Sequence, residues 1–104
     1  MRRRHPSGRE GNDIFKLSKK IIGDAGYGDY YNHGLGHGVG IDIHELPNFN
    51  RSKNTIAIGS VVTMEPGVYL PGVGGVRLED YGVVTENGYE PFTKTPHDLH
   101  VIDC

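Results

Sequence analysis

Residues 33–40 carry glycine at every second position, in the order His-Gly-Leu-Gly-His-Gly-Val-Gly. Alternation with a period of two is typical of an extended strand, and glycine along one face indicates that another part of the chain presses closely against it. The apolar residues Val39, Ile41 and Ile43 continue the alternation with the same parity as His37. We therefore predict one extended strand through both stretches, with its glycine face covered.

A helical period precedes this strand. Apolar residues recur at steps of three and four, and lysines occupy the opposite face. Asn12 or Asp13 is the expected N-cap, and Gly26 is the expected left-handed residue that ends the helix. The sequence therefore predicts an amphipathic helix over about 12–25, whose apolar face consists of Ile14, Leu17, Ile21, Ile22 and Ala25.

The second half of the chain is typical of antiparallel strands. Two strands are predicted at 61–70 and 75–85, joined by a turn at 71–74, and a short strand returns at 89–93. Residues 46–60 contain Pro47, three asparagines, two serines and Gly59, and we predict a long loop there. The expected fold is α+β, with the N-terminal helix packed on a curved antiparallel sheet.

Length and charge restrict the class of protein. A chain of 104 residues forms one small domain, which we expect over 12–104 after a flexible tail at 1–11. The formal net charge of -2 and the pI of about 6.3 argue against a nucleic-acid partner. No apolar run is long enough to span a membrane, and the single cysteine, Cys104, forms no internal disulfide. We predict a cytoplasmic protein.

Two glutamates are expected to face each other. A hairpin centred on Gly72 places Glu65 opposite Glu79, and like charges in directly opposed positions repel. Either one carboxyl group has a raised pKa or a bound cation neutralises the pair, and Arg77 offsets part of the charge. The alternative is that both carboxylates lie on a solvated sheet face. The Pro66-Gly67 dipeptide disfavours that alternative, because it ends strand pairing directly after Glu65.

Three of the six histidines, His33, His37 and His44, fall within a dozen glycine-rich residues. Imidazole is the commonest metal ligand and a proton shuttle near neutral pH. A lone histidine is more often structural, but three of them together with two opposed carboxylates favour a mixed nitrogen and oxygen site. Such a ligand set suits zinc, manganese, cobalt or iron rather than calcium, and it does not choose among them.

Three motifs, at 33–45, 63–69 and 75–81, together resemble the C-terminal motifs of Xaa-Pro aminopeptidases and prolidases. These enzymes belong to the pita-bread metallopeptidases, whose relatives include methionine aminopeptidase and creatinase. The resemblance implies half of a pita-bread fold and a cytoplasmic metallo-aminopeptidase or prolidase-like hydrolase that cleaves peptide bonds next to proline. Its peptide substrate contains proline.

The resemblance also implies roles for individual residues. His37, Glu65 and Glu79 correspond to metal ligands for two divalent ions, which are manganese, cobalt or zinc. Glu65 also handles the proton of the attacking water, and Glu79 bridges both ions. His44 corresponds to a catalytic group that contacts substrate and stabilises the tetrahedral intermediate.

The substrate-binding residues implied by the resemblance are His33, which lines the pocket, His44, and Arg77, which supports Glu79. Members of the family supply two further aspartate ligands and another histidine from upstream strands that this sequence does not contain. We therefore expect the C-terminal portion of a longer catalytic domain, weak or inactive alone, whose partner is the missing N-terminal half or a second copy. Two alternatives remain, a non-catalytic pita-bread interaction module and a methionine aminopeptidase.

Overall fold

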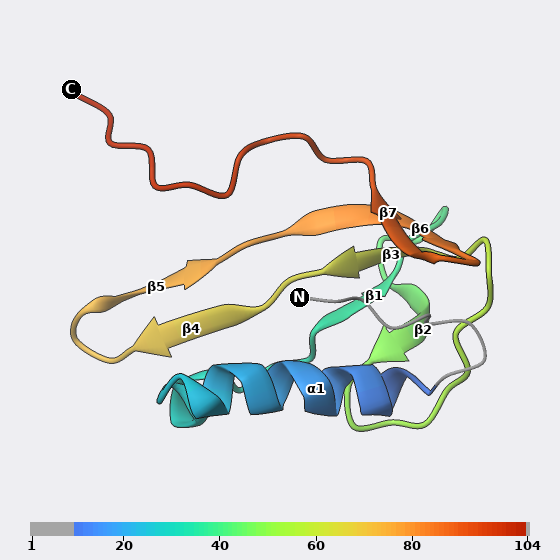
Figure 1. Cartoon of the computed structure of the whole chain (residues 1–104), viewed down its shortest axis with the longest axis horizontal. Coiled ribbons are helices and arrows are strands. Elements are labelled where there is room, and N and C mark those ends of the chain that lie inside the picture. Colours follow the sequence, from blue (N-terminus) through green and yellow to red (C-terminus); the bar gives the residue numbers. More distant parts are fainter. Residues whose placement is uncertain (1–9, 104) are drawn as a thin grey trace.

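The structure is a computed structural model, and it describes residues 10–103. In chain order its elements are α1 (Gly11–Asp24), the 3-10 turn η1 (Gly28–Tyr30), β1 (Gly36–Gly38), β2 (Glu45–Phe49), β3 (Val61–Met64), β4 (Gly67–Leu70), β5 (Gly74–Arg77), β6 (Asp80–Thr85) and β7 (Gly88–Pro91). Figure 1 shows α1 running beneath the strands as a separate layer. One helix on antiparallel strands is the predicted α+β fold, which is therefore confirmed.

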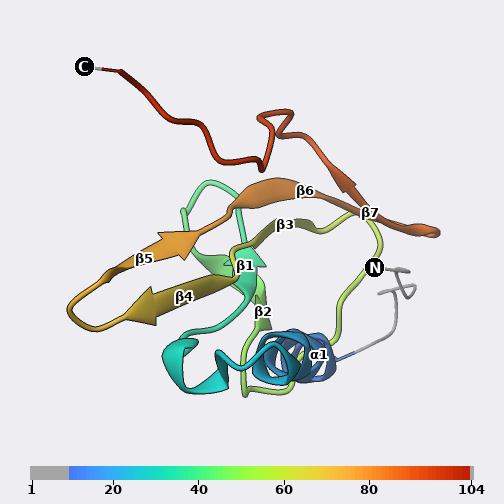
Figure 2. The same ribbon diagram turned by 60° about the vertical axis from the view of Figure 1, so that its left-hand side comes forward.

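The strands form one sheet and one hairpin extension. Five antiparallel strands pair in the order β2-β1-β3-β6-β7, and β4 and β5 pair only with each other. The chain passes directly from β3 into β4 and from β5 into β6, so the β4–β5 hairpin projects from the end of the sheet (Figure 2). Each of the two predicted long strands is thus divided in two, at 65–66 and at 78–79.

The predicted helix is confirmed to within one residue at each end. Gly26 has a φ of +95°, the Gly26 amide donates to Gly23, and the Tyr27 amide donates to Ile22. These two bonds form the Schellman motif that glycine permits. The predicted N-cap is wrong, because the extended residue before the helix is Glu10 and no side chain caps the first turn. Asn12 is instead buried within that turn.

The predicted apolar face is confirmed only in part, because the buried face of the helix is rotated toward Phe15. Phe15 is 7% exposed and belongs to the core, whereas Ile21 is 47% exposed. Ile14 and Ile22 pack partly against the core from its edge. The large aromatic side chain of Phe15 sets the rotation of the helix, because its ring packs edge-to-face on the ring of Tyr31. The buried core consists of Phe15, Tyr31, Leu35, Phe49, Ile56, Val62 and Val84.

The predicted glycine-rich strand is shorter than expected, but its glycine face is covered. A Cβ on Gly36 would lie 1.9 Å from the carbonyl oxygen of Thr63, and one on Gly38 would lie 2.3 Å from the carbonyl oxygen of Leu46. Only glycine allows β1 to sit this close to its neighbours. Beyond Gly38 the chain leaves the sheet, so Ile41 and Ile43 are exposed at 103% and 73% instead of continuing the strand.

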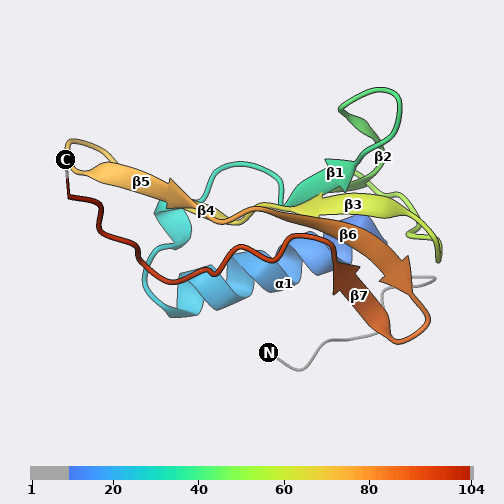
Figure 3. The same cartoon turned by 90° about the horizontal axis from the view of Figure 1, so that it is seen from above.

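The long loop predicted at 46–60 is wrong at its start. Residues Glu45–Phe49 form β2, which pairs with β1 and has a register shift beside His37. Pro47 and Asn48 have low strand propensity, but burial of Phe49 at 0% exposure and pairing with β1 outweigh it. Figure 3 shows β1 and β2 side by side at one edge of the sheet.

The ends of the chain fall largely outside the described residues. The predicted tail at 1–11 is described only at Glu10, which bridges to Thr55, and at Gly11, which begins α1. Cys104 lies outside the described range. Within residues 10–103 every helix is too short or too polar to cross a lipid bilayer.

Candidate metal centre

The register of the hairpin places the two glutamates at the same level. Met64 pairs with Asp80 at the end of the β3–β6 ladder, and Gly67 pairs with Arg77 at the end of the β4–β5 ladder. Continuing the β3–β6 register by one residue sets Glu65 opposite Glu79, so the predicted register is confirmed. Neither glutamate belongs to a ladder, because strand pairing stops on both sides of this level.

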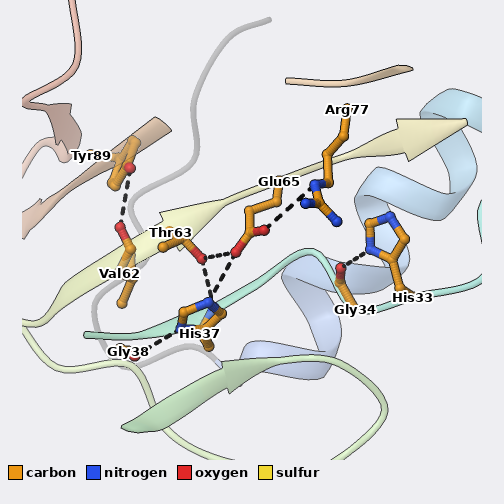
Figure 4. A network of polar contacts seen from close by, with 9 residues as sticks. All are labelled: His33, Gly34, His37, Gly38, Val62, Thr63, Glu65, Arg77 and Tyr89. Carbon is orange, nitrogen blue, oxygen red and sulfur yellow. Dashed lines mark hydrogen bonds and ion pairs between the residues drawn. The ribbon is translucent and has the colours of Figure 1, made fainter. Parts of the chain in front are cut away.

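Glu65 and His37 form the contact that joins the imidazole to a carboxylate. His37 Nε2 lies 3.0 Å from Glu65 Oε2, and the two side chains are 19% and 15% exposed. His37 lies in β1 and Glu65 directly follows β3. The Glu65 amide donates to the carbonyl oxygen of Leu35 at 2.5 Å. This bond holds the end of β3 against the segment that leads to His37. Figure 4 shows the imidazole and the carboxylate pointing toward one another.

The second ring nitrogen of His37, Nδ1, fixes the orientation of the ring. Nδ1 lies 2.9 Å from the carbonyl oxygen of Gly38. A carbonyl oxygen only accepts, so Nδ1 carries a proton and Nε2 is the atom available to a metal ion. A backbone carbonyl behind the ring is the usual support of a metal-binding histidine.

One hydroxyl group connects both residues. Thr63 Oγ1 donates to Glu65 Oε2 at 2.7 Å and accepts from the backbone N–H of His37 at 3.1 Å (Figure 4). Thr63 is 4% exposed. The buried hydroxyl therefore ties the carboxylate of one strand to the backbone of another.

Glu79 faces the same cleft as this pair. An open cleft of about 420 Å³ is lined by His37, Val39, Ile43, His44, Thr63, Glu65, Glu79 and Tyr81. The two opposed carboxylates and the imidazole thus share one concave surface. Within residues 10–103, however, no three His, Cys, Asp or Glu side chains are close enough together to form a metal-binding cluster.

The ligand pair at the centre of the cleft fits a divalent cation. A transition-metal ion binds imidazole nitrogen and carboxylate oxygen at about 2.0–2.2 Å. Two donor atoms 3.0 Å apart, as in His37 and Glu65, can both reach one such ion. An imidazole nitrogen combined with carboxylate oxygens suits zinc and manganese more than calcium, which prefers oxygen ligands alone.

The other two predicted histidines take different places. His44 lines the cleft and its ring lies 4.3 Å from the ring of His37. His33 is not among the cleft-lining residues of the described chain. Its ring packs between Tyr31 and Tyr69, and its Nε2 lies 3.1 Å from the Tyr69 hydroxyl. The sequence has no signal for Tyr69 as a partner, because the contact spans 36 residues.

Arg77 has a different partner from the predicted one. Its Nε lies 3.8 Å from Glu65 Oε1, across the hairpin, and not against Glu79. The register explains this contact, because it sets Glu65 opposite position 79 and makes Arg77 a diagonal cross-strand neighbour that a long side chain can reach. Arg77 is half exposed, so this is a weak ion pair at the rim of the site.

Asp80 lies directly beside Glu79, and its side chain accepts hydrogen bonds from Thr93 and from His97 Nε2, the latter at 3.1 Å. His97 carries no signal in the sequence. The residue lies in a weakly patterned segment, and no spacing relates it to Asp80.

Comparison with known proteins identifies relatives over most of the chain. The Xaa-Pro dipeptidase of Lactobacillus delbrueckii subsp. lactis is 44% identical over 96 residues, which cover 91% of this chain and 26% of the relative. The solved Xaa-Pro dipeptidase from Bacillus anthracis matches 97% of this chain and 29% of its own, with 40% identity and a TM-score of 0.89. This chain thus spans about a quarter of the length of these relatives.

A more distant structure gives the same fold. X-prolyl aminopeptidase from Caenorhabditis elegans, described as a cytosolic enzyme with a di-nuclear active site, matches 89% of this chain and 17% of its own, with 25% identity and a TM-score of 0.74. The fold therefore corresponds to part of the prolidase pita-bread fold, as predicted. The sequence pattern that defines metallopeptidase family M24 matches residues 1–86, and the chain belongs to that family.

Proposed function

We propose that this chain supplies His37, Glu65 and Glu79 as ligands to a metal-dependent peptidase that hydrolyses bonds next to proline. The observation that carries the proposal is the 3.0 Å contact between His37 Nε2 and Glu65 Oε2, in a cleft that Glu79 also lines. Two of the relatives named above are Xaa-Pro dipeptidases and the third is an X-prolyl aminopeptidase, which favours this activity over that of a methionine aminopeptidase. The substrate is a peptide that contains proline.

Each of the proposed site residues has its own role in the reaction. Two divalent ions, manganese, cobalt or zinc, would lower the pKa of a water molecule and polarise the scissile carbonyl group. Glu65 accepts the proton of the attacking water, and its Oε2 is held in place by Thr63. His44, exposed at the rim of the cleft, donates to the oxygen of the tetrahedral intermediate. His33 and Arg77 contact the substrate on the side of the β4–β5 hairpin.

We propose that the described residues supply part of such a centre. Because His37, Glu65 and Glu79 form no three-ligand cluster in residues 10–103, further ligands have to come from other residues. We propose that residues 12–104 form the C-terminal portion of the catalytic domain. The remaining ligands then come from the N-terminal part of such a domain, or from a second copy of the chain. Alone, the chain binds a single ion weakly and has negligible turnover.

The proposed cellular setting follows the relatives. The Caenorhabditis elegans enzyme is described as cytosolic, and we place this chain in the cytoplasm by analogy. The net charge of -2 supports a peptide partner rather than nucleic acid.

A non-catalytic interaction module is the second candidate. The absence of a three-ligand cluster from residues 10–103 favours it, since a binding module has no need of metal. Calorimetric titration of the chain with Mn²⁺ separates the two candidates. Heat of binding that disappears in Glu65→Gln supports the peptidase, and no binding by the unmodified chain supports the module.

The activity is tested in a hybrid enzyme. Residues 12–104 replace the matching segment of the Lactobacillus delbrueckii Xaa-Pro dipeptidase, and hydrolysis of a Xaa-Pro dipeptide is assayed with Mn²⁺, Co²⁺ or Zn²⁺. We expect activity in the hybrid and a fall in kcat of at least about 100-fold in Glu65→Gln, because proton transfer is removed. Glu86→Gln, in an exposed turn, is the matched control and retains activity. A folded hybrid that is inactive with all three metals contradicts the proposal.

A further inference from the structure

Glu79 lies where strand pairing gives it no direct support. The β4–β5 ladder stops at Arg77 and the β3–β6 ladder begins at Asp80. Between them the amide of Leu78 donates to the carbonyl oxygen of Pro66 at 3.2 Å. Glu79 itself is exposed and lies one residue beyond this bond. Its position in the cleft therefore depends on how firmly its neighbours are held, and Asp80 is the neighbour that begins β6.

Asp80 faces away from the cleft. Successive side chains of an extended segment point to opposite faces. Glu79 and Tyr81 both line the cleft, whereas Asp80 between them does not. The side chain of Asp80 therefore points to the face of the strand opposite the cleft.

Two side chains from the C-terminal segment meet Asp80 on that rear face. The hydroxyl of Thr93 and Nε2 of His97 both donate to Asp80 Oδ1, the latter at 3.1 Å. The Asp80 side chain is 22% exposed. We call Asp80, Thr93 and His97 the Asp80 clasp. Hydrogen bonds to an ionised, mostly buried carboxylate are among the stronger ones in proteins.

The same segment also supports the next residue of the cleft wall. The amide of Phe92 donates to the carbonyl oxygen of Tyr81 at 2.7 Å. The two rings pack edge-to-face with centroids 5.2 Å apart. Residues 92–97 thus hold Asp80, the chain neighbour of Glu79, and Tyr81, which itself lines the cleft.

We infer that the Asp80 clasp positions Glu79 for metal binding, so that the C-terminal segment shapes the site from behind without touching an ion. This inference rests on the proposed function, in which Glu79 is a ligand. Asp80 is a positioning residue here, and Thr93, which is less exposed than the half-exposed His97, is its main support. Residues that orient metal ligands typically change metal affinity by about 10- to 100-fold when they are replaced.

The test compares two substitutions at Thr93 in the full chain. Thr93→Val has nearly the same shape but no hydroxyl, and Thr93→Ser keeps the hydroxyl. Mn²⁺ affinity is measured by isothermal titration calorimetry. We expect Thr93→Val to weaken binding at least about tenfold and Thr93→Ser to retain it. His97→Gln, which leaves Thr93 in place, should produce a smaller loss.

A matched variant separates positioning from general stability. Val84→Ala removes buried methyl groups from β6 without altering the clasp, so it lowers the free energy of unfolding but should leave Mn²⁺ affinity unchanged. If Val84→Ala weakens binding as much as Thr93→Val does, or if Thr93→Val binds Mn²⁺ as the unmodified chain does, the inference is overturned.

Glu79→Gln distinguishes this inference from the proposed function. Weaker Mn²⁺ binding in Glu79→Gln together with normal binding in Thr93→Val overturns the inference alone. An unmodified chain that binds no Mn²⁺, or a Glu79→Gln variant that binds normally, overturns the role of Glu79 as a ligand and the inference with it. Loss of affinity in both variants supports both.

Discussion

The backbone of His37 and the carboxylate of Glu65 are joined through a single hydroxyl, that of Thr63. This hydroxyl accepts from the His37 amide and donates to Glu65 Oε2, while His37 Nε2 approaches the same oxygen at 3.0 Å. A hydroxyl group donates and accepts at the same time, so one side chain fixes both partners. The positions of the His37 backbone and the Glu65 carboxylate are thus fixed relative to each other by the protein itself.

Thr63→Val tests this arrangement. The substitution leaves the His37 amide without its acceptor in a largely buried place, which costs about 1–3 kcal/mol. We expect the free energy of unfolding in urea to fall by that amount and hydrogen exchange at the His37 amide to accelerate. Thr63→Ser keeps the hydroxyl and is the control. Equal exchange rates at this amide in Thr63→Val and the unmodified chain would show that the contact is unimportant.

Gly36→Ala tests the close approach of β1 to β3. The added Cβ would lie 1.9 Å from the carbonyl oxygen of Thr63, a backbone atom that moves only with its strand. We expect a loss of about 3 kcal/mol in unfolding free energy, measured by urea denaturation. Gly23→Ala in α1, where nothing lies within 4 Å of the new atom, should instead stabilise the chain by about 0.8 kcal/mol. A Gly36→Ala chain of unchanged stability would contradict the packing of these strands.

Alkaline pH is expected to destabilise the chain through Tyr31. Burial raises the pKa of Tyr31 above 10.0, although its hydrogen bond with Ser18 acts in the opposite direction. Because the unfolded chain ionises first, this contribution to stability is complete below about pH 10 and is lost as pH rises further. Unfolding free energy measured between pH 8 and pH 11 should therefore fall more steeply in the unmodified chain than in Tyr31→Phe. Tyr30→Phe, at an exposed position, should follow the unmodified chain.

Acid pH is expected to lower the free energy of unfolding through Asp80. Burial favours its neutral form, but the hydrogen bonds from Thr93 and His97 outweigh burial and hold the pKa of Asp80 below 3.8. The resulting stability is present above the ordinary pKa of an aspartate and is lost as pH falls below about 4. Unfolding free energy between pH 6 and pH 2 should depend less on pH in Asp80→Asn than in the unmodified chain. Asp98→Asn, on an exposed residue of the same segment, should leave the slope unchanged, and an unchanged slope in Asp80→Asn would be evidence against the clasp.

The sequence was sufficient to predict those parts of the fold that depend on local signals. Helical periodicity and Gly26 located α1, and a turn centred on Gly72 predicted the register that brings Glu65 opposite Glu79. Both signals act over a few residues or across one tight turn. The contact of His37 with Glu65 agrees with the resemblance to pita-bread metallopeptidases, which implies that both residues are metal ligands.

Other features depend on contacts that local patterns do not encode. β2 forms because Phe49 is buried and β1 offers a pairing partner, although its own residues favour a loop. Arg77 contacts Glu65 because the two are diagonal neighbours across the hairpin, which alternation within one strand does not predict. His97 reaches Asp80 through a segment without periodicity. In each case the decisive partner is distant in sequence.

The position of β3 inside the sheet, between β1 and β6, has a further consequence. At the level of the two glutamates the Glu65 amide donates to Leu35 on a third segment and not to the opposite strand. In an antiparallel pair only every second residue exchanges hydrogen bonds with its partner, so the ribbon of residues 61–85 keeps alternate backbone groups for a strand on its other side. This two-sided pairing is therefore what allows a third stretch of chain to bring its imidazole alongside two acidic side chains.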